Sequence, residues 1–136
     1  MTLELDVTEA RAGIRDMRER LQSLLRGSQA AIGRALVAEA EVEMALMIAR
    51  TPMEHGDLRG SYRVVGPIFE RGTVSVLIVC GGPKAPYAWY VHENLEEFHK
   101  VGQSKFMESV INEAKRHHAA HVGARVGSEL SRLVRP

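Results

Sequence analysis

Apolar residues recur at helical spacing through the N-terminal part of the chain. From Thr8 to Leu25, and again from about Gln29 to Arg50, they occupy every third or fourth position, as on one face of an amphipathic helix. The Gly27-Ser28 step between the two patterns leaves two alternatives. Either the helix breaks and Ser28 caps a second one, or one long helix tolerates the glycine at a cost of about 1 kcal/mol relative to alanine. The apolar positions of the first pattern are Ile14, Met17, Leu21, Leu24 and Leu25.

A loop containing proline and glycine follows this helical region. The helix is expected to end at or near Arg50, because Pro52 lacks an N–H and disfavours helical geometry in the residue before it. Gly56 can supply a positive φ if the loop needs one. We expect Leu58 to anchor the loop to the core, and Arg59 to be either a salt-bridge brace or a subunit contact.

The middle of the chain has the pattern of a β-hairpin. One strand is predicted from Ser61 to Phe69, with a bulge or a sheet edge at Pro67, which cannot donate to a ladder. The β-branched run Thr73–Cys80 predicts a second strand, joined to the first by a turn at Glu70-Arg71-Gly72. The segment Tyr87–Glu93 is too short for periodicity to decide between a third strand and a helical turn.

A final helix is predicted from a cap at Ser104, and its pattern weakens beyond His118. The whole chain is therefore expected to be one α+β domain, with a long helical region, a small antiparallel sheet and a C-terminal helix packed on the sheet. Residues 1–27 are a candidate helical arm, and residues 122–136 a candidate mobile tail. The apolar positions of the final helix are Phe106, Met107, Val110, Ile111 and Ala114.

Composition narrows the class of protein. The 18 basic and 17 acidic residues give a net charge of +1, which lacks the basic excess usual in nucleic-acid-binding proteins. The arginines of the terminal helices alternate with acids and indicate solvated faces. Cys80 is the only cysteine, so we expect no intrachain disulfide and a small buried side chain. No apolar run approaches the roughly 20 residues of a membrane span, and the acidic N-terminus does not resemble a signal peptide.

The histidines offer weak metal and acid–base candidates. His117 and His121 are one helical turn apart and could share a metal ion, but no further ligand lies at a supporting spacing, which favours a solvated helix surface. His92-Glu93, like Glu54-His55, could be an acid–base pair. Neighbours on a strand point to opposite faces, however, so a joint role is not expected. We therefore predict neither an enzyme nor a cofactor.

Three short motifs, in order, carry a resemblance to a known family. They lie in the proline loop, in the aromatic segment and at the start of the final helix. They read Thr51-Pro52-x-x-His55-Gly56-x-Leu58-Arg59-x-Ser61, Tyr87-Ala88-x-Tyr90-Val91-His92-Glu93 and Lys105-Phe106-Met107. Together, from about Ala30 to Ala120, they resemble the tail-completion (neck) proteins of long-tailed bacteriophages and prophages. His55, where this family commonly has threonine, and Lys105, where proline often precedes the phenylalanine, leave a related tail terminator or minor capsid protein as alternatives.

This resemblance implies a mechanical function in the virion. The chain would form a homo-oligomeric ring, for example a hexamer, between the DNA-filled head and the tail. Its partners would be head-completion proteins and tail-terminator or tail-tube proteins, with DNA passing through the lumen without sequence readout. A small metal- or nucleic-acid-binding module is the alternative from another class. The structural and interaction candidates are Pro52, Gly56, Leu58, Arg59, Ser61, Tyr87, Tyr90, His92, Glu93 and Phe106.

Overall fold

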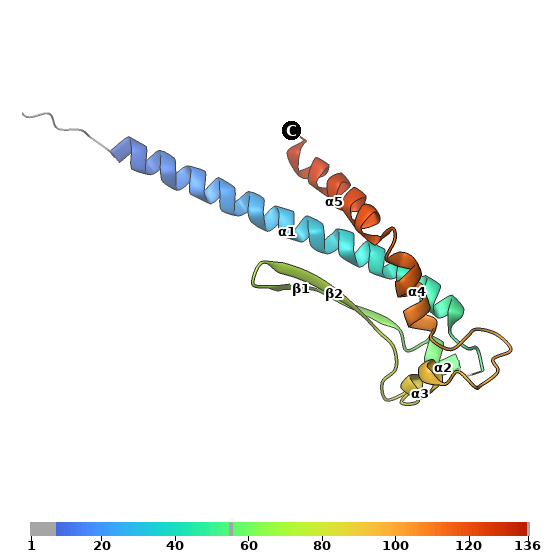
Figure 1. Cartoon of the computed structure of the whole chain (residues 1–136). Helices are drawn as coiled ribbons and strands as arrows, with labels where there is room; N and C mark the ends of the chain where they lie inside the picture. The colour runs from blue at the N-terminus through green and yellow to red at the C-terminus, as the bar shows by residue number, and fades with distance from the viewer. Residues whose placement is uncertain (1–7, 55, 136) are drawn as a thin grey trace, which may run out of the picture.

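The structure is a computed structural model that describes residues 8–54 and 56–135. Its two strands and five helices confirm the α+β class (Figure 1). The motif residue His55 and the first residues of the expected arm, 1–7, lie outside the described part. The elements are α1 (Thr8–Arg50), α2 (Gly56–Arg59), β1 (Arg63–Glu70), β2 (Thr73–Val79), α3 (Ala88–Glu93), α4 (Phe106–Ala114) and α5 (His118–Val134).

A single helix of 43 residues, α1, forms the long axis of the molecule (Figure 1). It continues through Gly27 and Ser28, so the second of the two alternatives holds. The Ser28 hydroxyl donates back to the carbonyl of Leu24 at 2.9 Å instead of capping a new helix. The helix ends at Arg50, as Pro52 predicts.

The predicted hairpin is confirmed. β1 and β2 pair antiparallel, and the register shifts between Val65 and Ile68, which places the bulge at Pro67. The turn residues Arg71 and Gly72 have φ values of 48° and 78°, the positive signs that a two-residue type I′ turn requires. The hairpin lies along α1, where Gly33 permits close approach: a Cβ there would lie 3.0 Å from Cβ of Pro67.

The aromatic segment forms a helix, so the alternative of a third strand does not hold for the described residues. The amide of Val91 donates to the carbonyl of Tyr87 at 3.1 Å, and that of Asn94 to Tyr90 at 3.0 Å. A helical turn satisfies these backbone groups locally, whereas a third strand would need an edge of the hairpin.

The C-terminal helices pack on α1. Figure 1 shows α5 on one side of α1 and the hairpin on the other, and both α4 and α5 contact α1. This corrects the expectation that the C-terminal helix packs on the sheet. Polar contacts join α1 to α5 on this face, because Arg34 binds Glu129, and Glu43 lies 2.7 Å from His118. Of the candidate tail, residues 122–136, the part as far as Val134 belongs to α5, and Glu129 within it contacts Arg34.

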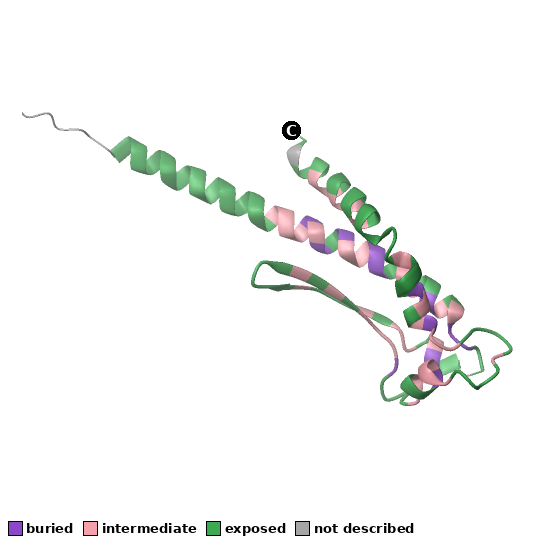
Figure 2. Cartoon of the chain, viewed as in Figure 1, coloured by how far each residue is buried: buried purple, intermediate pink, exposed green. Residues whose placement is uncertain are grey.

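Burial is concentrated in the second half of α1 and at its C-terminal end (Figure 2). Every residue from Thr8 to Arg26 is exposed, and we call this part of α1 the arm. Its five apolar side chains, named above, are 57–63% exposed and form what we call the arm stripe. None of the described helices combines the length and the apolar character needed to cross a membrane.

Glu39 is the buried charge at the contact between α1 and α5. It accepts a 2.8 Å hydrogen bond from Nε of Arg125 and lies 3.1 Å from Nδ1 of His121. Burial acts to raise the pKa of Glu39, but the hydrogen bonds from Arg125 and His121 outweigh it, so the pKa lies below its ordinary value of 4.5. The stability that this carboxylate contributes is therefore complete above pH 4.5 and is lost as the pH falls through the lowered pKa.

We predict that Glu39→Gln lowers the free energy of unfolding at pH 7 by about 1–3 kcal/mol, because two partners lose a charged acceptor. The loss should shrink as the pH falls below 4.5, where the wild-type carboxylate is itself neutralised. Urea unfolding at pH 7 and pH 3.5 checks both points. The control is Glu41→Gln, an exposed position on the same helix. Equal losses for the two variants would contradict the assignment.

Candidate functional site

The three sequence motifs meet at one end of the molecule, beyond the C-terminal end of α1 (Figure 1). We call the described residues at this end, 51–54, 56–62 and 80–106, the tip. Leu58, Ala85, Val91 and Phe106 form its buried core, and Tyr87 packs against them. The expectation that Leu58 anchors the loop is confirmed, since its side chain is fully buried.

Arg59 donates hydrogen bonds to carbonyl groups at the C-terminal end of α1. Its Nε and Nη2 donate to the carbonyl of Thr51 at 2.9 and 2.7 Å, and Nη2 also reaches the carbonyl of Ala49 at 3.4 Å. The last carbonyls of a helix lack partners within the helix, and a guanidinium can satisfy several of them at once. Arg59 is therefore a brace, but its partners are carbonyls, which corrects the expectation of a salt bridge.

Thr51 and Pro52 are buried beneath the loop that leads from α3 to α4, residues 94–105. Gly102 crosses them with a φ of 93°, and a Cβ at this position would lie 2.6 Å from the nitrogen of Pro52, so only glycine fits. The next amide, that of Gln103, donates to the carbonyl of Arg50 at 2.9 Å. The 94–105 loop is thus fastened directly to the end of α1.

Three hydroxyl groups tie the hairpin to α2 and to this end of α1. Thr51 Oγ1 hydrogen bonds the carbonyl of Met47 and lies 2.8 Å from the Tyr62 hydroxyl. Burial raises the pKa of Tyr62 above its ordinary value, so this phenol stays neutral. Ser61 Oγ donates to the carbonyl of Leu58 at 2.7 Å and accepts from the amide of Gly81 at 2.8 Å. Both ends of the hairpin are therefore held to α2 and α1.

His92 and Glu93, neighbours in α3, do pair, contrary to expectation. His92 Nδ1 lies 2.7 Å from Glu93 Oε1, and Glu93 also binds the ammonium of Lys105. Hydrogen bonds accepted from Lys105 and His92 lower the pKa of Glu93, and the hydrogen bonds that Lys105 donates to Glu93 and Glu108 raise the pKa of Lys105. Both groups are held in their charged forms, which suits bracing the tip better than transferring protons.

Lys105, not Ser104, stands before the first residue of α4. It has a left-handed φ of 55° and makes no side-chain cap hydrogen bond. Its amide donates to the carbonyl of His92 at 2.7 Å, so the backbone turn is held by α3. The Ser104 hydroxyl donates to the carbonyl of Asn94, inside its own loop. The predicted Ser104 cap is therefore wrong.

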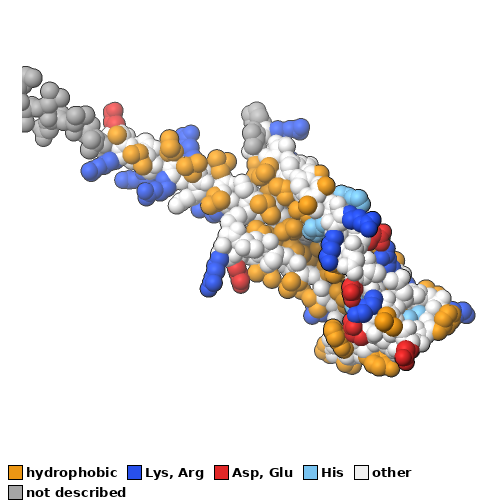
Figure 3. Space-filling view, in the orientation of Figure 1, with side chains coloured by type: hydrophobic (Ala, Val, Ile, Leu, Met, Phe, Trp, Pro, Cys, Tyr) orange, Lys and Arg blue, Asp and Glu red, His pale blue; other side chains and the backbone are white. Residues whose placement is uncertain are grey.

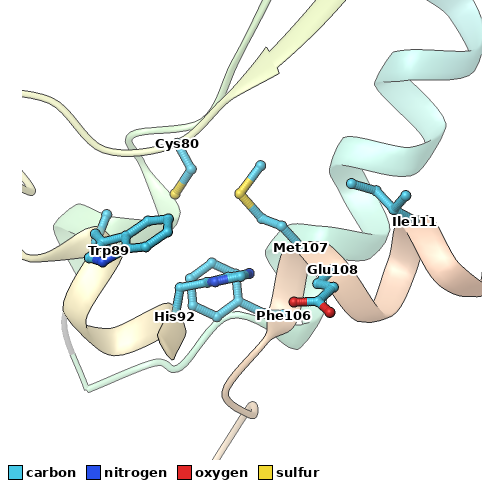
Figure 4. A pocket seen from close by; sticks show the side chains of 8 residues that line it. Cys80, Trp89, His92, Phe106, Met107, Glu108 and Ile111 are labelled. Atoms are coloured by element: carbon cyan, nitrogen blue, oxygen red, sulfur yellow. The ribbon is translucent and has the colours of Figure 1, made fainter. Parts of the chain in front are cut away.

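An apolar groove lies between α3 and α4. Its volume is about 290 Å³, and Figure 4 shows Trp89 and Cys80 on one side of it and Met107 and Ile111 on the other. The half-buried Cys80 packs against the tip core, and it also lines the groove. The rings of His92 and Phe106 form a T-shaped pair, with centroids 4.9 Å apart. The groove can accept an apolar side chain more readily than a charged one.

Four large apolar side chains project from the tip into solvent, and we call them the tip patch. They come from α3 and from the loop after it. They are Trp89, Tyr90, Leu95 and Phe98, with 65–87% of each exposed. Of the two candidate tyrosines, Tyr87 thus belongs to the core and Tyr90 to the surface. Large apolar side chains exposed at the same end of a molecule are typical of a contact with another molecule.

Some side chains contact residues far away in the chain, and their spacing in the sequence did not predict these contacts. His117 and His121 stack with ring centroids 6.0 Å apart, but Nδ1 of His121 faces Glu39, which is 82 positions away in the chain. Glu54 lies 3.6 Å from His99, while its considered partner His55 is outside the described residues. The sequence offers one signal for the contact between Glu39 and His121: α5 has a hydrophobic face, and the part of α1 opposite it is acidic.

We predict that Arg59→Ala lowers the free energy of unfolding by about 1–3 kcal/mol, because the terminal carbonyls of α1 lose their donor. Arg59→Lys should recover only part of this loss, since an ammonium cannot reproduce the planar guanidinium whose Nε and Nη2 both donate to the Thr51 carbonyl. Urea unfolding followed by circular dichroism measures both variants. Unchanged stability of Arg59→Ala would show that the brace is not needed.

The hydrogen bonds of the tip thus support an apolar surface, and its charged side chains pair with one another. No protein-family model, curated protein or solved structure matches the chain. The role of the tip has to be argued from its own geometry and from that of the arm.

Proposed function

We propose that this chain is a structural virion protein of a long-tailed bacteriophage or prophage, and that it forms part of an oligomeric ring joining the DNA-filled head to the tail. Two things support the proposal. The three motifs that resemble tail-completion proteins belong to one compact tip, and the chain carries apolar surface suited to assembly. The arm stripe is the observation on which the proposal rests.

An isolated helix with the composition of the arm is marginally stable in water, since most helical stability in proteins comes from packing of an apolar face. The arm has such a face, but it makes no burying contact among the described residues: Leu21 and Leu24 are 60% and 57% exposed. The polar side of the arm carries charged residues, including the exposed ion pair between Arg20 and Asp16. A second protein surface is the natural cover for the arm stripe.

The positions of the two apolar surfaces favour a ring over a closed dimer. The arm stripe lies at one end of α1 and the tip patch at the other (Figures 1 and 3). When two different surfaces of a subunit pair with each other, the contact is head-to-tail, and repeating it gives a ring where the rotation between subunits closes and a filament where it does not. The near-zero net charge limits repulsion between copies. The neighbours in the virion would be head-completion proteins and tail proteins, and DNA would pass without base readout.

We predict that Leu21→Glu weakens self-association at least about tenfold, because burying a leucine contributes about 1.5–3 kcal/mol. Light scattering coupled to size-exclusion chromatography over a range of concentrations measures this. The matched control is Gln22→Glu, which adds the same charge at the neighbouring exposed position and should assemble like the wild type.

The role in the virion needs a separate experiment. In a phage or prophage that encodes this chain, deleting its gene should leave filled heads and separate tails. The wild-type chain supplied from a plasmid should restore joining, and Leu21→Glu should not. A wild-type chain that stays monomeric at every concentration, together with normal joining after the deletion, would overturn the proposal.

A further inference from the structure

Two loops of the tip bring together three groups able to bind a metal ion. Glu54 comes from the loop after α1, and Glu97 and His99 come from the 94–105 loop. One ligand atom from each lies within 4.8 Å of the others. The two loops are already fastened to each other, because the amide of Lys100 donates to Glu54 Oε1 at 3.4 Å and Gly102 lies against Pro52.

His99 provides the observation that points to a ligand. Its side chain is only 3% exposed, and its Nδ1 is buried without a hydrogen-bond partner in the described part of the chain. This atom faces Glu54 Oε2 at 3.6 Å, beyond hydrogen-bond distance. A buried polar atom without a partner is costly, so a native structure normally supplies one.

The other ring nitrogen indicates which form His99 takes. Nε2 lies 3.4 Å from Ser104 Oγ, and that hydroxyl already donates its own proton to the carbonyl of Asn94. Ser104 can therefore only accept from His99, which places a proton on Nε2. In the neutral imidazole Nδ1 then carries a lone pair that faces a carboxylate. Metal-binding histidines commonly have this arrangement, with the outer N–H held by a hydrogen bond.

We propose that Glu54, Glu97 and His99 bind a divalent transition-metal ion, Zn²⁺ or Mn²⁺. One imidazole nitrogen and two carboxylate oxygens form a mixed ligand set that suits these ions better than Mg²⁺, which prefers oxygen ligands alone. Ligands of a tetrahedral zinc ion lie about 3.4 Å apart, so the carboxylates must close in on the ion. Both glutamates are exposed and can turn, while the buried histidine stays in place.

The bound ion would join the loop after α1 to the 94–105 loop, beside the tip patch. It would act on the isolated subunit, so the proposal does not rest on ring assembly. A different occupant of the same gap is a proton on Nδ1, which would make His99 a cation beside Glu54. The two cases differ in whether added metal binds.

Isothermal titration calorimetry of the chelator-treated full chain with Zn²⁺ and with Mn²⁺ tests the proposal. We expect one ion per chain, and we expect Glu97→Gln to weaken binding at least about tenfold, a loss seen even when an outer partner of a metal ligand is removed. Glu96→Gln, a neighbouring exposed carboxylate, is the matched control and should bind like the wild type. Circular dichroism confirms that each variant is folded.

A second measurement excludes the histidines of α5. His117→Ala removes one of the two stacked imidazoles there and should leave metal binding unchanged. Hydrogen exchange of the 94–105 loop should slow when the ion is added to the wild type and stay unchanged in Glu97→Gln. The proposal is overturned if the wild type binds neither ion, if Glu97→Gln binds as tightly as the wild type, or if His117→Ala abolishes binding.

Discussion

The carbonyl groups at the C-terminal end of α1 set the main constraint on this structure. A helix that ends inside a folded region leaves acceptors that must find donors there. Arg59 supplies donors to Thr51 and Ala49, and the amide of Gln103 supplies one to Arg50. These bonds draw the loop after α1 and the 94–105 loop onto the same point. These bonds determine where the tip core, the hairpin ends and the candidate metal ligands lie.

The rest of the fold is arranged around α1 as a shared support. The hairpin and the C-terminal helices lie on different sides of it and meet little otherwise. Such a layout buries little apolar surface for the length of the chain, which is why small residues such as Ala31 and Ala35 are among the most buried. Ionic contacts between helices, centred on Glu39, then matter more than they would in a larger core.

Features governed by local chemistry could be predicted from the sequence. Pro52 marks the end of α1, the positive φ at Gly72 follows from the turn, and Pro67 marks the bulge. The sequence does not decide whether the segment Tyr87–Glu93 is a helix or a strand, because seven residues are too few to separate a helical period from a strand period. The face on which α5 packs depends on partners such as Glu39, which no local pattern reveals. The same holds for Glu54 and His99, which belong to different loops.

The unbroken course of α1 has a mechanical consequence. At a rise of 1.5 Å per residue, its 43 residues make a rod about 65 Å long. Once a partner covers the arm stripe and stabilises the arm, a rod without a hinge at Gly27 transmits torque along its whole length. Any partner that grips and rotates the arm therefore turns the far end of the rod as well, where Arg59 and Gly102 clasp it. Binding at one end of the chain and the geometry of the other end are coupled through a lever, with no change of secondary structure required.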